Sequence, residues 1–167
     1  MSNDKIEKTE DQIKLEEFFK IKDINGNVLY TTSETELTDA LVSILTTGAF
    51  VKTFTLFGGK IELTYTSIAD KERISGYELM RLYSDNNKDI SEIQMGAYNS
   101  KVNIALQLLR IKTNGNNTTN LAQGPLDERI VLLGELGEEM VRLTSKYLMI
   151  FANITSKAFN SEDVLKN

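Results

Sequence analysis

The sequence predicts an α+β fold in which a small antiparallel β-hairpin layer packs on a mainly α-helical bundle. Two stretches of alternating apolar and polar residues each cross a glycine-containing turn, whereas the rest of the chain shows helical periodicity without a further strand signal. Alternation is typical of strands, and a period of about 3.6 residues is typical of helices. We therefore expect one domain over 18–167 behind a charged, flexible arm over 1–17, with hairpins over about 18–30 and 50–66 and helices over about 34–47, 68–83, 89–112, 125–136 and 138–158.

The first 17 residues are strongly charged, with three lysines, six acids and few apolar side chains. Such a segment buries too little apolar surface to offset the entropy lost on ordering. We expect a solvated arm. The alternative is an arm that folds onto a neighbouring chain through Ile6, Ile13 and Leu15.

The first hairpin is predicted around the turn Asn25-Gly26-Asn27, because apolar residues stand on both sides of it. Ser33 then begins a helix, since Glu36 follows it at the spacing of a capping box, in which the two side chains satisfy each other's backbone N–H groups. Gly48 is placed to end this helix, because glycine readily adopts the left-handed conformation of a C-terminal cap.

The second hairpin turns at Gly58-Gly59, since glycine takes a positive φ without strain. A two-residue loop places Phe57 opposite Lys60 and so defines the register of both strands. One face then carries Phe54, Leu56, Ile61 and Leu63 and needs a cover, because a hairpin alone is unstable. The other face carries the residues that we expect to remain available to a partner, namely Thr53, Thr55, Glu62 and Thr64.

The rest of the chain is predicted to be helical. Residues 89–112 carry two neighbouring apolar stripes, too wide for a helix that packs on one side, so we expect this helix to be central and the second hairpin to lie on it. Residues 113–124 are turn formers without periodicity and predict an exposed loop. Pro125 is placed to begin the next helix.

The chain has no cysteine and no histidine. It therefore lacks thiolate nucleophiles, histidine-based catalytic triads and most transition-metal sites. Carboxylate, lysine or tyrosine catalysis remains chemically possible, but the acidic pairs lie near predicted helix starts. Five tyrosines lie within apolar stripes and are interpreted as residues at the edge of the core: Tyr65, Tyr77, Tyr83, Tyr98 and Tyr147. We assign no catalytic, cofactor-binding or metal-binding residue and expect neither enzymatic activity nor a small-molecule substrate.

The net charge of −5 argues against a nucleic-acid or anionic-membrane surface, because both need clustered lysine and arginine. No apolar run approaches the ~20 residues that span a bilayer. Protein partners are therefore the expected ligands, met in the cytosol or in a particle assembled there.

The order of four stretches resembles small tail and baseplate-hub assembly proteins of contractile-tailed bacteriophages. These stretches are FTLFGGKIELTYTSIADKER, YNSKVNIALQLLRI, LDERIVLLGELGEEMVRLTSKYLMIF and SEDVLKN, and the third contains Glu128-Arg129 followed by Leu132 and Leu133. The resemblance covers about residues 50–167 and carries no catalytic residue. It implies a non-enzymatic virion component or assembly chaperone, found in the virion or in the host cytoplasm during assembly, whose partners are other phage structural proteins or further copies of itself.

Other functional classes remain open at this point. A head-to-tail connector or neck subunit would assemble into rings. A small cytosolic regulatory protein would bind a host protein, and a carboxylate-based enzyme would need a deep pocket in which acids converge.

Overall fold

The computed structural model describes residues 9–68, 70–114 and 117–165. Helices and strands follow one another as α1 (Glu10–Phe19), β1 (Lys20–Lys22), β2 (Val28–Thr31), α2 (Glu34–Thr47), β3 (Val51–Leu56), β4 (Ile61–Thr66), α3 (Asp70–Asn86), α4 (Glu92–Gln107), β5 (Leu108–Thr113), β6 (Asn117–Asn120), α5 (Leu126–Glu135) and α6 (Glu138–Leu165). The described chain thus has the α+β architecture that the sequence predicts.

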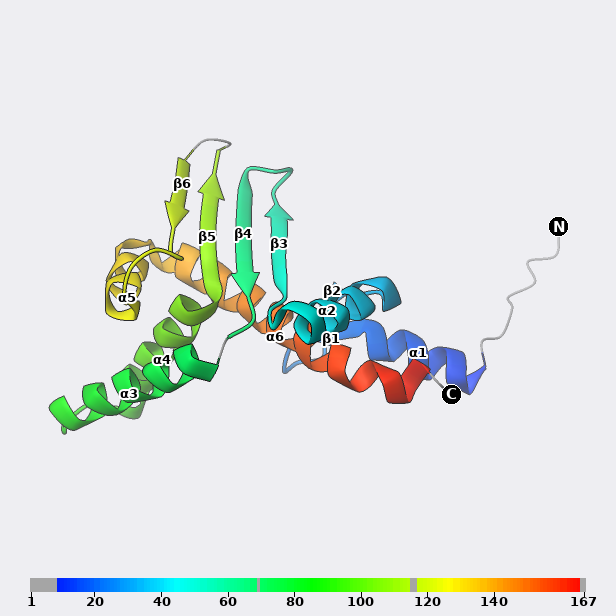
Figure 1. The fold of residues 1–167 in the computed structure, drawn as a ribbon, viewed down its shortest axis with the longest axis horizontal. Coiled ribbons are helices and arrows are strands. Elements are labelled where there is room, and N and C mark those ends of the chain that lie inside the picture. The colour runs from blue at the N-terminus through cyan, green and yellow to red at the C-terminus, as the bar shows by residue number, and fades with distance from the viewer. Residues whose placement is uncertain (1–8, 69, 115–116, 166–167) are drawn as a thin grey trace.

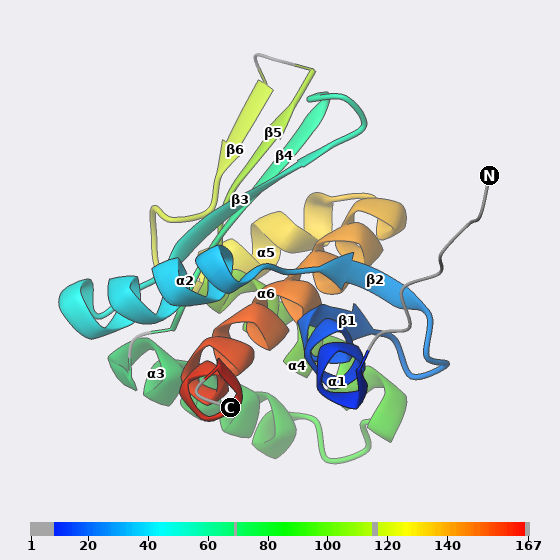
Figure 2. The ribbon, with the colours of Figure 1, turned by 90° about the vertical axis from the view of Figure 1, so that its right-hand side faces the viewer.

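The strands form two antiparallel sheets. β1 pairs with β2, and the larger sheet has the order β3-β4-β5-β6. Figures 1 and 2 show this larger sheet standing on the helical layer, with the turn between β3 and β4 pointing away from the helices and α6 running across the base of the sheet.

The core lies between one face of the larger sheet and α6. Phe54, Leu63 and Tyr65 are buried on the sheet side, opposite Ile150 and Phe151 of α6. Aromatic rings join the two layers, since the Tyr65 ring stacks on Phe151 at 5.8 Å between centroids. The Tyr65 hydroxyl also donates a hydrogen bond to the Thr144 carbonyl, at 2.8 Å. The second hairpin therefore packs mainly on α6, whereas the prediction placed it on a helix over 89–112.

The predicted helix over 89–112 is also wrong in its last five residues. α4 ends at Gln107, and residues 108–113 form β5, which pairs with β4 with Ile111 opposite Leu63. Leu108 and Ile111 fit a helical stripe as well as a strand, and tertiary pairing decides between the two. α4 has a wide apolar surface because it packs against three helices, α3, α5 and α6.

The predicted loop over 113–124 contains a strand. β6 pairs with β5, so that Thr119 lies opposite Ile111. Residues 115 and 116 of that loop lie outside the described residues. Threonine favours strands when a neighbouring strand offers a ladder of backbone groups, and β5 supplies that ladder here.

The predicted flexible arm is helical from Glu10 onward. Thr9 and Gln12 form a capping box, in which the Thr9 hydroxyl accepts from the Gln12 N–H at 3.3 Å and the Gln12 side chain accepts from the Thr9 N–H at 3.0 Å. Glu10 and Asp11 stand in the first turn, where they complement the positive end of the helix dipole. Of the arm's anchors, Ile13 and Leu15 lie on this helix and are exposed, whereas Ile6 lies outside the described residues.

Local signals place several elements correctly. α2 spans the predicted range, with Ser33 accepting from the Glu36 N–H at its start and Gly48 at φ 76° at its end. In the second hairpin Phe54 faces Leu63 and Thr53 faces Thr64, as predicted. The loop is longer than predicted, since the strands end at Leu56 and Ile61, and Phe57 joins the two glycines at positive φ.

The other boundaries differ modestly. α3 and α6 extend beyond their predicted C-terminal ends at residues 83 and 158, and Pro125 is the N-cap of α5 rather than its first helical residue. The first hairpin begins at Lys20, because Phe18 and Phe19 complete α1.

Candidate protein-binding site

The face of the larger sheet that points away from α6 gathers the predicted partner-binding residues. Thr53 and Thr55 of β3 lie directly opposite Thr64 and Glu62 of β4. The Thr53 and Thr64 hydroxyl oxygens are 2.9 Å apart and share a hydrogen bond. Thr53 and Thr55 are exposed, whereas Thr64 is only 7% exposed. The two threonines of β3 are thus far more accessible to a partner than Thr64.

Four further residues on this face were not predicted as part of the site. The register extends the face across β5 and β6, with Arg110 and Lys112 beside β4 and Thr118 and Asn120 at the far side. Lys112 forms an ion pair with Glu62 at 3.1 Å. Arg110 is exposed and makes no ion pair within the described ranges. The alternation of Leu109 and Ile111 with the basic residues Arg110 and Lys112, followed by Asn114-Gly115, was the sequence signal for this strand.

β3 forms an edge of the sheet, and its backbone orientation follows from two hydrogen bonds. Phe50 accepts from the Ser67 N–H at 2.9 Å, and Lys60 accepts from the Asn114 N–H of the β5 side at 2.8 Å. Backbone groups of alternate residues in a strand point to opposite sides. Val51, Thr53 and Thr55 therefore direct their N–H and C=O groups outward, away from β4.

The outward row of β3 carries no charge. Val51 is 53% exposed, and Phe57, which follows β3 in the turn, is 67% exposed. Its pairing with β4 is regular, and β3 contains neither proline nor a bulge. Natural proteins usually protect an edge strand with charges, prolines, bulges or short length. β6, the opposite edge, is protected in this sense, because it has four residues and an asparagine at each end.

Lys52 is the one charged residue of β3, and its charge is held inside the molecule. Its ammonium group pairs with the Glu36 carboxylate, and both side chains are more than four-fifths buried. Glu36 also accepts from the Thr32 hydroxyl at 2.7 Å and from the Tyr30 hydroxyl at 3.1 Å. The capping box predicted at the start of α2 is thus half formed, because Glu36 uses its side chain in this network.

In this network the charge of the Lys52 ammonium group is balanced by the Glu36 carboxylate. Burial by itself would lower the pKa of Lys52, but the Glu36 carboxylate outweighs that effect and raises it. Burial, followed by the charge of Glu36, raises the pKa of Tyr30. A lysine held in its charged form is a poor nucleophile or base. We interpret the network as a support that anchors β3 to α2.

The tyrosines divide between core and surface. Tyr65 is fully buried, and burial raises its pKa. Tyr83 and Tyr98 stack on each other at 3.7 Å between centroids, where α3 and α4 meet. Tyr77 is exposed, so its predicted place at the edge of the core is wrong. It stands on the side of α3 that no described helix covers, which periodicity alone does not show.

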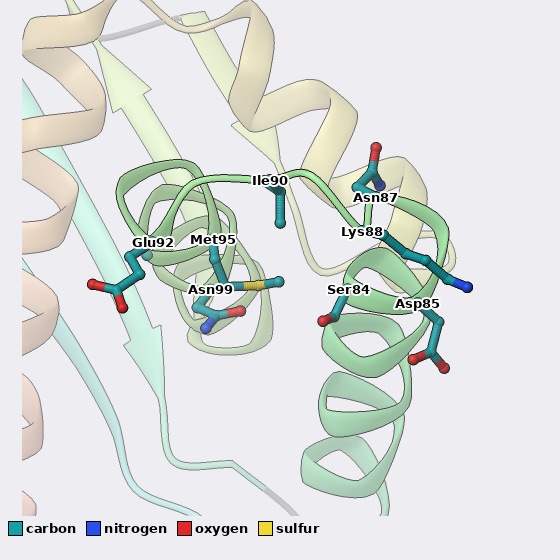
Figure 3. A pocket seen from close by; sticks show the side chains of 9 residues that line it. Ser84, Asp85, Asn87, Lys88, Ile90, Glu92, Met95 and Asn99 are labelled. Carbon is teal, nitrogen blue, oxygen red and sulfur yellow. The ribbon is translucent and has the colours of Figure 1, made fainter.

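A hollow of about 660 Å³ lies where the end of α3 approaches the start of α4. Figure 3 shows Ile90, Met95 and Asn99 facing the space between the helices, while Asp85 and Glu92 point away from each other. The Asn99 Oδ1 atom is buried and has no hydrogen-bond partner among the described residues. An amide acceptor beside apolar side chains suits a hydrogen-bond donor such as water, but the carboxylates do not converge here.

The described ranges contain no cluster of three or more acidic side chains that could hold a metal ion. None of the helices in these ranges combines the length and the apolar character needed to cross a bilayer.

In comparisons with known proteins, no protein-family model matches the chain, and no curated protein and no solved structure shows significant similarity to it.

Proposed function

We propose that this protein is a non-enzymatic structural or assembly protein of a phage tail or baseplate hub, and that it acts through protein-protein contacts made by its larger sheet. The observation that carries the proposal is the open, uncharged edge of β3 beside an uncovered polar face. Such an edge offers unpaired backbone groups to an extended segment of another protein.

The phage setting is supported by the resemblance of residues 50–167 to tail and baseplate-hub proteins. Its expected partners are other phage structural proteins or further copies of the chain. Its expected location is the virion, or the host cytoplasm while the particle is assembled.

Two measurements test this function together. The tagged protein is used to capture tail and baseplate proteins from phage-producing cells, and purified virions are analysed by mass spectrometry. We expect a tail or baseplate protein among the captured partners, the protein itself in the virion, or both. Absence of both signals would contradict the proposal.

A matched pair of proline variants tests whether the contact uses β3. Thr53→Pro removes an outward N–H from β3, and Thr118→Pro removes one from β6. Thr118 is also an outward residue, because Leu121 donates to the Leu109 carbonyl at 2.8 Å and orientation alternates along β6. We expect capture of the partner at β3, whether a tail protein or a second copy of the chain, to be lost in the first variant and kept in the second. Circular dichroism verifies that both variants are folded.

A further inference from the structure

We propose that β3 pairs antiparallel with β3 of a second copy of this chain, about a twofold axis at Thr53, and so joins two four-stranded sheets into one. This inference rests on the sheet-mediated contact of the proposed function and names its partner. Closed twofold dimers are the commonest oligomers, and each patch in them meets its own copy.

Backbone geometry selects the register. Antiparallel neighbours exchange hydrogen bonds only between residues whose backbone groups point toward each other. The Phe50 carbonyl accepts from the Ser67 N–H and so points toward β4. Because orientation alternates along a strand, the backbone groups of Val51, Thr53 and Thr55 point outward. An axis at Thr53 places Thr53 opposite its own copy and Val51 opposite Thr55 of the second copy. All three outward residues then find a partner.

Charge complementarity favours a second copy as the occupant. In this register Lys52 lies opposite Phe54 of the other strand, so the two lysines do not face each other. Within one chain Lys52 already stands over the Phe54 ring, at 5.0 Å from its centroid, while Glu36 neutralises its charge. A cation beside an aromatic face is a favourable contact. A partner strand with charges opposite Val51, Thr53 and Thr55 would find no counter-charge on this row, whereas a second copy brings an equally uncharged row.

The side chains that would face each other across the proposed β3-β3 pair are also compatible. On the side away from α6, Val51 meets a threonine, which is a β-branched pair of the kind that stabilises neighbouring strands. The net charge of −5 would repel two copies at other surfaces, whereas the outward row of β3 is uncharged.

The absence of cysteine from the sequence allows a direct test, since each introduced cysteine is the sole thiol in the chain. Paired residues that exchange hydrogen bonds have Cα atoms about 5.5 Å apart, within the range of disulfides. Under mild oxidation we expect Thr53→Cys to shift from the 18.8 kDa of one chain to twice that mass on a non-reducing gel. Thr55→Cys and the β6 control Thr118→Cys should remain monomers. A mixture of Val51→Cys with Thr55→Cys should cross-link.

Sedimentation of the unmodified protein gives an independent measurement. We expect a dimer that Thr53→Lys converts to a monomer while Thr118→Lys leaves it intact, because a charge on the outward row of β3 opposes pairing. A monomeric wild-type protein, or a Thr53→Cys variant that does not cross-link, would overturn self-pairing. A ring of higher order would also overturn it, since a twofold contact closes on itself.

Cross-linking and partner capture together distinguish a failure of self-pairing from a failure of the proposed phage function. If Thr53→Cys stays monomeric while Thr53→Pro still abolishes capture of a phage protein, self-pairing is wrong and the function stands. If Thr53→Cys cross-links while capture and virion analysis find nothing, the dimer stands and the phage function is wrong.

Discussion

Tyr65 is the residue that links the sheet to the helical layer most directly. It is fully buried, its ring lies between Phe54 and Phe151, and its hydroxyl donates to the Thr144 carbonyl. A buried hydroxyl needs such a partner, since an unpaired polar group in an apolar core is costly.

We therefore expect Tyr65→Phe to reduce the free energy of unfolding by about 1 kcal/mol, because a buried carbonyl loses its hydrogen bond while the ring packing remains. Urea unfolding followed by circular dichroism measures this change. Tyr77→Phe is the matched control, since Tyr77 is 63% exposed, and it should be nearly neutral. Equal effects of the two substitutions would contradict the proposed role of the Tyr65 hydroxyl.

The Glu36–Lys52 pair predicts a specific alkaline instability. The pKa of Lys52 is raised above its ordinary value of 10.5 in the folded protein. Its contribution to stability is therefore complete below pH 10.5 and is lost as the pH rises through the folded pKa. Stability measured across this range should fall more steeply in the wild type than in Lys52→Met.

The matched control is Lys60→Met, which removes a lysine from the turn of the same hairpin. It should keep the wild-type slope, because Lys60 makes no ion pair within the described ranges. If Lys52→Met and the wild type lose stability in parallel above pH 10.5, the pair does not contribute as we expect.

At the scale of elements, the contact between α3 and α4 explains the glycine within α3. A Cβ atom at Gly76 would lie 2.8 Å from Leu106 Cδ1, a buried side chain of α4. At Gly96 of α4, the same construction meets no heavy atom within 4 Å. Gly76 thus permits close approach of the two helices, whereas Gly96 has no such role.

This difference predicts opposite outcomes for the same substitution. Gly96→Ala should stabilise the protein by roughly 0.5–1 kcal/mol, through helix propensity and a less flexible unfolded chain. Gly76→Ala should lose that gain or destabilise, because overpacking a well-packed contact costs about 1–3 kcal/mol. Thermal unfolding of both variants measures the difference, and a stabilised Gly76→Ala variant would show that α3 and α4 separate easily.

At the scale of the whole molecule, stability should be unevenly distributed. α1 has no buried residue, and one of its links to the rest is the hydrogen bond from the Lys157 ammonium group to the Phe18 carbonyl, at 2.5 Å. β4 is paired on both sides, and the middle of α6 carries Ile150, Phe151 and Ile154 in the core. Local opening costs least where few apolar contacts are lost.

Native-state hydrogen exchange should therefore show early exchange of α1 amides and late exchange of β4 and of residues 150–154 in α6. Lys157→Met should speed exchange in α1 while leaving β4 unchanged, because the substitution removes the bond to Phe18. Protection of α1 equal to that of β4 would mean that α1 unfolds only with the whole protein.

The sequence by itself determined the features that depend on neighbouring residues. Ser33 and Gly48 delimit α2, and the alternation around Gly58-Gly59 gives the register of the second hairpin, including the face of Thr53, Thr55, Glu62 and Thr64. Caps and tight turns are satisfied within a few residues of the chain, so their signals are complete in the local sequence.

Only the tertiary structure decided the role of residues distant along the chain. Leu108 and Ile111 fit a helix and a strand equally well, and pairing with β4, more than 40 residues earlier, makes them a strand. That pairing places Arg110 and Lys112 on the polar face, encloses β4 and leaves β3 as an open edge. Backbone groups of a strand are satisfied by another strand, and no local pattern specifies which strand that is.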